Sequence, residues 1–235
     1  MSLTSSETTV LTYDESATIL SRYGIPLAKG RVATSRDDAV NVARSVGYPV
    51  ALKAISKQVS HKTEANAIKL GVKSDGELLQ AFDEVTGNLK KYDPKAEVVG
   101  VLVQEMLGGG TEVIVGTTRD PSFGPVAMFG LGGIFVEVLK DVSLRVLPIS
   151  KYDAEEMVKE IKGYKVLEGF RGKPRADIQA IVDILLKVSK LATEMEGTVS
   201  ELDLNPVIVF PEGRGARVVD ARLVLSKGVV EAKAA

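Results

Sequence analysis

The chain has 235 residues, 45% of them hydrophobic, which is long enough for one large core or two smaller ones. Its 30 Lys and Arg nearly balance 31 Asp and Glu, and a formal net charge of −1 excludes a general electrostatic affinity for nucleic acid or anionic membranes. With no Cys and a single His, a disulfide scaffold, a thiol nucleophile and a multi-histidine metal centre are excluded as well.

The hydrophobic residues are spread along the chain. No apolar stretch approaches the ~20 residues that cross a bilayer, and the start of the chain lacks the pattern of a secretory signal. We therefore expect a globular cytoplasmic protein without a membrane segment.

The first hundred residues alternate helices with short apolar strands. Cap residues followed by apolar positions at helical spacing predict three helices, starting at Asp14, after Ser35 and after Ser74. Strands are predicted at 49–54, 68–72 and 98–103. This alternation is typical of helices packed on a sheet, and we place a subdomain boundary near Gln104, which gives subdomains 1–103 and 104–235.

The second half is richer in strands. EVIVGTT, GPVAMFG and SLRVLPI predict short strands between Gly, Pro and Asp turns, and two helices follow, one capped near Asp153 and one over 176–195. The segment ELDLNPVIVFPEGRGARVVDAR predicts a hairpin, in which Pro206 requires an edge or a bulge. The fold class is therefore α/β, with an α+β character in the second half.

Three oxygen-bearing side chains recur in this last hairpin. Asp203 and Asn205 share one face of a strand by the period-two rule, and Asp220 lies near the end of the returning strand. Carboxylate and amide oxygens, completed by water and phosphate, are what Mg²⁺ accepts. For an isolated DxN motif, simple turn punctuation is the favoured alternative.

Two further segments could meet a nucleotide. Lys53 in PVALKA could hold phosphates as a point charge, although a lysine reaching to water from an edge strand is the simpler interpretation. Gln104, Glu105 and Met106 precede three glycines and Glu112, so this hinge could face an adenine edge while Glu112 meets ribose hydroxyls or a second metal. The glycines could equally form two tight turns, and they match no phosphate-loop motif.

The single histidine, His61, lies in the polar segment SHKTEANAIKLGV. A neutral imidazole nitrogen can attack phosphorus, and Lys62 could offset phosphate charge. A surface-loop histidine without a function is the favoured interpretation for any lone His. Against this interpretation, the segment is polar and follows the Lys53 strand, which suits a solvated loop.

Taken together, PVALKAISKQVSHKTEANAIKLGV, the segment 101–148 and ELDLNPVIVF with VVDAR resemble the ATP-grasp β subunit of ADP-forming acyl-CoA synthetases, a branch of the succinyl-CoA synthetase superfamily. The resemblance runs from about Tyr13 to Arg222. It implies an ATP-grasp fold of two subdomains with the nucleotide in the cleft between them.

The resemblance also implies a set of site residues. Lys53, the hinge residues Gln104, Glu105 and Met106, and nearby Glu112 would contact ADP or ATP. Mg²⁺ would bind at Asn205 and Asp220. His61 would be a phosphohistidine that relays phosphate to ADP, and Asp203 would face it. The resemblance also places Glu137, Asp141 and Arg145 on a phosphate-facing strand and loop.

The activity implied is that of an acid–thiol ligase, in which acyl-CoA, phosphate and ADP give acid, CoA and ATP. A CoA-binding α subunit would be the partner, in an α2β2 heterotetramer. One departure is that Ala65 and Asn66 replace a Gly-Gly pair common in the family, which would stiffen the His61 loop. The alternatives are a stand-alone carboxylate–amine ligase and a nucleotide-sensing regulatory subunit.

Overall fold

The computed structural model describes residues 8–56, 58–59, 64–133 and 138–226. Contacts divide the chain into two units. The larger unit comprises Met1–Leu11, Glu15–Leu27 and Gly109–Ala235, and the smaller comprises Thr12–Asp14 and Ala28–Gly108. Within the described ranges, no helix combines the length and apolar character that a membrane span requires.

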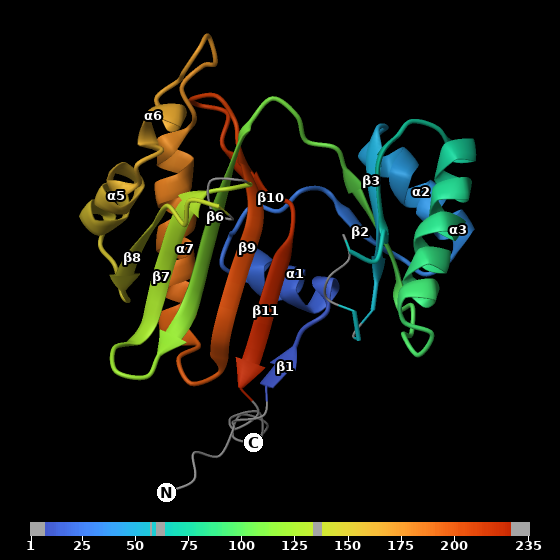
Figure 1. The fold of residues 1–235 in the computed structure, drawn as a ribbon, viewed down its shortest axis with the longest axis horizontal. Coiled ribbons are helices and arrows are strands. Elements are labelled where there is room, and N and C mark those ends of the chain that lie inside the picture. Colours follow the sequence, from blue (N-terminus) through green and yellow to red (C-terminus); the bar gives the residue numbers. More distant parts are fainter. Residues whose placement is uncertain (1–7, 57, 60–63, 134–137, 227–235) are drawn as a thin grey trace, which may run out of the picture. The chain divides into compact units, whose positions relative to one another are not determined.

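The smaller unit is an antiparallel four-stranded sheet with two helices on one face (Figure 1). Its strand order is β2-β5-β3-β4. Val50, Leu52 and Ala54 of the middle strand β3 pack on the helices through fully buried side chains. The elements are β2 (Gly30–Ala33), α2 (Arg36–Val46), β3 (Val50–Ile55), β4 (Ile68–Val72), α3 (Asp75–Tyr92) and β5 (Gly100–Glu105).

Both helices of this unit begin where the cap residues predicted. Ser35 accepts a hydrogen bond from the Asp38 N–H at 3.2 Å, and Ser74 accepts one from the Glu77 N–H at 3.3 Å. These bonds satisfy amide donors that have no partner inside a helix. The Glu77 carboxylate accepts from the Lys73 N–H at 2.8 Å. In a capping box it would accept from the N–H of the cap residue itself, Ser74, so the bond here lies one residue earlier in the chain.

A hydrogen-bonded group links the two helices of the smaller unit. The Tyr48 hydroxyl donates to Asp75 at 2.8 Å, and Asp75 also pairs with Arg44. Burial, followed by the bond to Asp75, raises the pKa of Tyr48 to about 12. The folded state therefore holds the phenolic proton more tightly than the unfolded chain does, and this contribution to stability is lost as the pH rises from about 10 through about 12.

Replacing Tyr48 by Phe removes this group. We expect Tyr48→Phe to lower the Tm at pH 8 by about 2–4 °C, the loss of one hydrogen bond in a chain of this size. The variant should also lose less stability than the unmodified protein between pH 10 and 12. Thermal unfolding followed by circular dichroism across this pH range checks both; equal alkaline losses would contradict the assignment.

The larger unit is built on an antiparallel sheet to which the described residues contribute seven strands, in the order β1-β11-β9-β6-β7-β8 with β10 beside β9. The described residues also form four helices, and α1, α5, α6 and α7 contribute to one hydrophobic core with one face of the sheet (Figure 1). The strands are β1 (Thr8–Val10), β6 (Thr111–Asp120), β7 (Gly124–Leu131), β8 (Val142–Val146), β9 (Val199–Val209), β10 (Ala216–Val218) and β11 (Ala221–Ser226). The helices are α1 (Tyr13–Arg22), α5 (Lys151–Glu160), α6 (Tyr164–Leu167) and α7 (Ile178–Glu194).

Two helix starts differ from the sequence prediction. Helix α1 begins at Tyr13, so Asp14 lies inside its first turn and is not the cap. Helix α5 is capped by Ser150, whose side chain exchanges hydrogen bonds with Asp153 in a capping box. Asp153 is therefore the third helical residue, where its carboxylate satisfies the Ser150 N–H.

Strand register defines a second face of the large sheet, opposite the helices. Leu202 and Leu204 of β9 belong to the helix-side core, so Glu201 and Asp203, which alternate with them, lie on the second face. Arg222 pairs directly with Asp203 and shares that face. This second face carries most of the polar candidates in the larger unit.

Of the edge or bulge that Pro206 was expected to require, the structure shows a bulge. The β6–β9 register shifts between Val113, which pairs with Val207, and Val115, which pairs with Leu204. Strand β9 thus has one residue more than β6 over this interval, at Asn205 and Pro206. The sequence prediction is confirmed.

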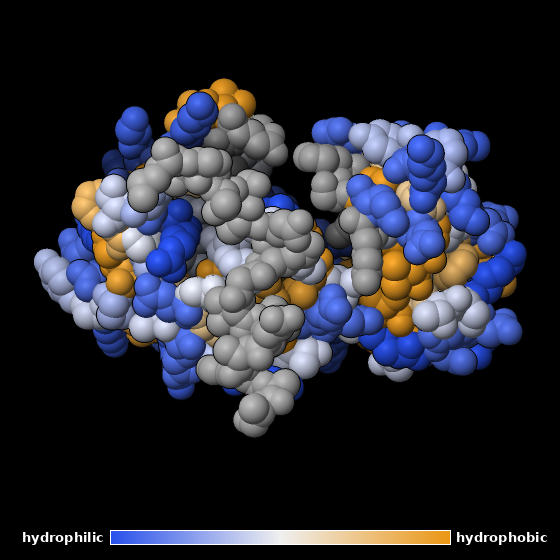
Figure 2. Space-filling view, turned by 90° about the horizontal axis from the view of Figure 1, so that it is seen from below, coloured by the Kyte–Doolittle hydropathy of each residue, from blue (hydrophilic) through white to orange (hydrophobic). Residues whose placement is uncertain are grey.

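The described residues on one face of the molecule are coloured by hydropathy in Figure 2. Figure 2 shows hydrophilic residues over most of the visible face, with hydrophobic residues in separate smaller patches. This distribution fits a chain with 26% charged residues and a net charge near zero.

Candidate functional site

Lys53 is a buried lysine in an interior strand. Strand β3 lies between β5 and β4, and Lys53 is only 5% exposed. Leu52 and Ala54 point to the helix-side core, so Lys53 points to the opposite face of the sheet. A lysine reaching to water from an edge strand is therefore excluded. A lysine on this face could bind phosphate oxygens as a point charge.

The hinge residues use their backbone donors within the smaller unit. The Glu105 N–H donates to the Lys29 carbonyl at 2.8 Å, and the Met106 N–H to the Pro49 carbonyl at 3.3 Å. The Glu105 carboxylate in turn accepts from the Lys29 N–H at 2.7 Å. Both N–H donors are therefore already used, and a ligand at this hinge would have to bind other groups.

The Gln104 side chain supplies such a group. It is fully buried and lies on the same face as Lys53, because Gln104 pairs with Ala51. Its Nε2 donates to the Tyr13 hydroxyl at 3.1 Å, while its Oε1 has no hydrogen-bond partner among the described residues. A buried acceptor without a partner is costly, so this oxygen suits a donor on a bound ligand.

Glu112 belongs to the larger unit. It pairs with Ile208 across β6 and β9, and it is exposed on the second face, since its neighbour Val113 lies in the helix-side core. Along β6 it is four residues from Gly116, which pairs with Asp203, so roughly 13 Å of strand separates the two positions. Glu112 and Asp203 therefore lie on the same face of the sheet but are not neighbours.

Asn205 and Asp220 lie side by side. The Asn205 N–H donates to the Asp220 carbonyl at 3.0 Å, and the Asp220 carboxylate accepts from the Ala221 N–H at 3.0 Å. The bulge turns Asn205 outward, where it is exposed. One carboxylate and one amide oxygen fit the donor chemistry of Mg²⁺, which is commonly completed by phosphates and water. The described residues contain no group of three or more acidic or histidine side chains that could hold a metal alone.

The surroundings of Asp203 disfavour its charged form. Burial, followed by the charges of Glu201 and Asp220, raises its pKa, and Arg222 opposes the rise. Asp203 is thus a partly buried carboxylate among other carboxylates, with one guanidinium on the facing strand. Perturbed groups of this kind cluster at functional sites. The sequence analysis identified Asp203 but missed Arg222, because only the β9–β11 register places Arg222 opposite it.

His61 and Glu137 lie outside the described residues, so their predicted roles stay predictions. The departure next to His61 does have a described consequence. Asn66 adopts a positive φ of 48°, and its carbonyl accepts from the Asn88 side chain at 3.0 Å. Asparagine tolerates this left-handed conformation better than other non-glycine residues, which explains how it can stand where the resemblance led us to expect glycine.

Asp141 and Arg145 have partners inside the larger unit. Asp141 is buried and accepts from the Lys162 N–H at 2.8 Å and the Gly163 N–H at 2.7 Å. Arg145 pairs with Glu160 of α5, on the helix side of the sheet. That side is opposite the face with Asp203, so Arg145 makes a structural link between β8 and α5.

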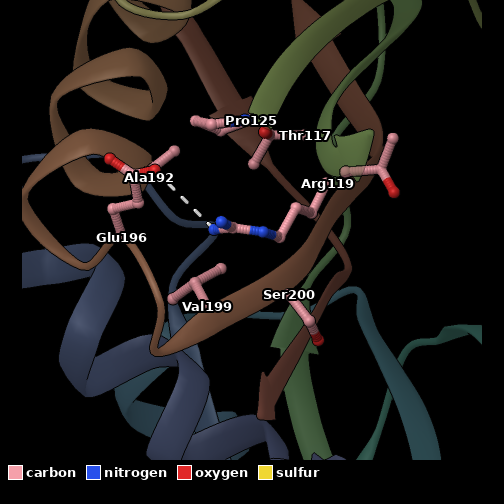
Figure 3. A pocket seen from close by; sticks show the side chains of 8 residues that line it. Thr117, Arg119, Pro125, Ala192, Glu196, Val199 and Ser200 are labelled. Carbon is pink, nitrogen blue, oxygen red and sulfur yellow. Dashed lines mark ion pairs between the residues drawn. The ribbon is translucent and has the colours of Figure 1, made fainter. Parts of the chain in front are cut away.

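A small pocket lies where β6 and β9 meet the end of α7 (Figure 3). Arg119 extends across it towards Glu196, with 3.7 Å between the Nη1 and Oε1 atoms. Its volume of about 10 Å³ has room for about one water molecule. The pocket is therefore too small for a substrate, and the ion pair beside it is a suitable control for other arginine–glutamate pairs of this unit.

Comparison with known proteins agrees with the fold. The family model described as ATP-grasp domain matches residues 2–225. The chain is 50% identical over 211 residues to acetate–CoA ligase [ADP-forming] II subunit beta of Pyrococcus furiosus, covering 90% of this chain and 89% of that one. The chain therefore belongs to the ATP-grasp family, in the group of the ADP-forming acetate–CoA ligase β subunits.

Two further relatives extend the comparison. Acetate–CoA ligase [ADP-forming] I of Archaeoglobus fulgidus is 49% identical over 215 residues, which are 92% of this chain but 31% of that protein. The dinucleotide-forming acetyl-coenzyme A synthetase 1 of Ca. Korarchaeum cryptofilum, solved with coenzyme A and Ca-AMPCP, has a TM-score of 0.89 and 46% identity, covering 92% of this chain and 93% of that one. Another structure of it contains Mg-AMPPCP, with the phosphohistidine segment pointing towards the nucleotide-binding site (TM-score 0.80, 43% identity, 92% and 93% covered). The chain thus spans nearly all of some relatives and about a third of another.

Proposed function

We propose that this chain is the nucleotide-binding β subunit of an ADP-forming acyl-CoA synthetase, an acid–thiol ligase that converts acyl-CoA, phosphate and ADP into acid, CoA and ATP. The observation that carries the proposal is the 50% identity to a β subunit of this activity over nearly the full length of both chains. The partner is a CoA-binding α subunit, in an α2β2 heterotetramer. The Archaeoglobus relative, of which this chain matches 31%, is long enough to contain such a partner in the rest of its chain.

The chemistry assigned to this chain is phosphoryl transfer between His61 and the nucleotide. In the direction of ATP synthesis a β-phosphate oxygen of ADP attacks phosphohistidine, the N–P bond breaks and a P–O bond forms. Lys53, Gln104, Glu105, Met106 and Glu112 bind the nucleotide. In functional terms, residues 1–103 contribute the relay histidine and residues 104–235 the metal site.

Asn205 and Asp220 would hold Mg²⁺, which when bound neutralises phosphate charge. Asp203 faces the phosphohistidine in this proposal. The Mg-AMPPCP complex of the Korarchaeum relative supports both the metal and the adenine nucleotide.

The test is reconstitution. Co-purified with its α subunit, the chain should give activity that depends on CoA, phosphate and ADP, and [γ-³²P]ATP should leave acid-labile, base-stable label on this chain. Ligation of a carboxylate to an amine without any partner would favour the stand-alone ligase instead. Nucleotide binding without label, with the partner present, would favour a sensor.

The Gln104 side chain predicts a preference for adenine. Its Oε1 can accept from the adenine amino group, whereas guanine presents a carbonyl oxygen at that position. We expect Gln104→Leu to raise the KM for ADP by about tenfold, the loss of one buried hydrogen bond, and to leave the KM for GDP unchanged. Steady-state kinetics with both nucleotides measure the ratio.

Tyr13→Phe provides the matched control. It removes the side-chain partner of Gln104 and leaves the Oε1 acceptor in place. It should keep the ADP over GDP preference of the unmodified protein. An unchanged preference in Gln104→Leu would show that adenine is selected elsewhere.

A further inference from the structure

Arg222 stands at a particular place on the second face of the large sheet. It is the second residue of β11 and pairs directly with Asp203 of β9. Its Nη1 donates to the carboxylate of Glu201, which lies two residues before Asp203 on the same face. Glu201, Arg222 and Asp203 therefore form one group, and the candidate metal ligand Asp220 precedes Arg222 by two residues along the chain.

The charges of this group are unequal. Three carboxylates, from Glu201, Asp203 and Asp220, act together on this stretch of the face, and Arg222 is the cation that offsets them at Asp203. A phosphoryl group brings further negative charge. Carboxylates alone would repel it, so a phosphoryl group near Asp203 needs a positive group there.

The geometry of the guanidinium suits that role. A guanidinium has five N–H donors in a planar fork, and the bond to Glu201 uses one of them. Anchoring at Glu201 fixes one arm of the side chain, which reduces the conformational freedom lost when the other donors bind an anion. Arginine in this form binds phosphate oxygens with two parallel hydrogen bonds.

We propose that Arg222 is a catalytic residue that donates hydrogen bonds to the phosphoryl group during transfer from histidine to ADP, and that Glu201 positions it. This inference rests on the proposed function. Arg222 keeps its protons throughout, because only the N–P bond breaks and only the P–O bond to ADP forms. Its contribution is to charge that spreads over the phosphoryl oxygens in the transition state.

A surface ion pair without function is the competing explanation, since exposed pairs contribute little. Arg119 and Glu196 form such a pair in the same unit, on the helix side of the sheet and thus opposite the face with Asp203. Arg119→Gln is therefore the matched control for Arg222→Gln. Both variants remove one exposed guanidinium from a glutamate partner.

The experiment uses the enzyme reconstituted with its α subunit and measures single-turnover labelling of the histidine from [γ-³²P]ATP, together with the KM for ADP. We expect Arg222→Gln to slow labelling by about 10²–10³-fold, as for the loss of one transition-state donor, with the KM for ADP within threefold. Arg222→Lys should recover part of the rate, because it restores charge without the fork. Glu201→Gln should fall between Arg222→Lys and the unmodified enzyme, and Arg119→Gln should match the latter.

The inference is overturned if Arg222→Gln labels as fast as Arg119→Gln, or if only its KM for ADP changes. Should Arg222→Gln fail to fold, Arg222→Lys carries the test, and a rate equal to that of the unmodified enzyme overturns the inference. Failure of the proposed function looks different: the unmodified enzyme would then take up no acid-labile label.

Discussion

Replacing His61 by alanine is expected to abolish phosphoryl exchange between phosphate donors and ADP, by more than about 10⁴-fold, as for the loss of a nucleophile. His61 is the single histidine of a chain without cysteine, so no other imidazole or thiol is present in this subunit to take the phosphoryl group. The measurement is label transfer from [γ-³²P]ATP in the complex with the α subunit.

Nucleotide binding should survive this change. Lys53, Gln104 and Asp220 are untouched in His61→Ala, and calorimetric titration with ADP should give a Kd within about threefold of that of the unmodified complex. Full exchange activity in the variant would disprove the relay. Loss of binding together with exchange would instead point to a structural role for His61.

The second large effect is expected at Asp220. Asp220→Asn keeps an oxygen that can accept from the Ala221 N–H but removes the negative charge. The Mg²⁺ concentration for half-maximal exchange should rise by at least about tenfold, because Mg²⁺ favours carboxylate over amide oxygen. Exchange measured over a range of Mg²⁺ concentrations checks this.

Asp120→Asn is the control for Asp220→Asn. Asp120 lies at the β6–β7 turn and accepts from the Ser122 and Phe123 N–H groups, so it loses the same charge in a similar hydrogen-bonding role. Its Mg²⁺ dependence should equal that of the unmodified protein. If both variants shift together, net charge and not ligation is responsible.

Local chemistry explains why much of the fold could be predicted. Ser35 and Ser74 cap the helices they were expected to cap, and Pro206 lies in the bulge that its missing N–H requires. Each of these signals involves residues close in sequence. The predicted start of α1 was wrong. An aspartate such as Asp14 can cap a helix or lie in its first turn, and residue type alone does not distinguish the two positions.

Long-range pairing explains what could not be predicted. Strand β1 is three residues long and pairs with β11, which lies near the other end of the sequence. The residues around Thr8 therefore contain no local pattern that predicts this strand. Arg222 became a candidate only when register placed it opposite Asp203. Lys53 needed the strand order, since the sequence does not distinguish an edge strand from an interior one.

The division of the chain into units has a consequence for the order of folding. All strands and helices of the smaller unit lie between Gly30 and Glu105, in one continuous stretch, whereas the larger unit must join Thr8 to Ser226 and β6 to β9. Loop closure over such separations slows the formation of a sheet. During synthesis the smaller unit, with Lys53 and Gln104, can therefore be complete while the strands that bear Asp203 and Arg222 have yet to leave the ribosome.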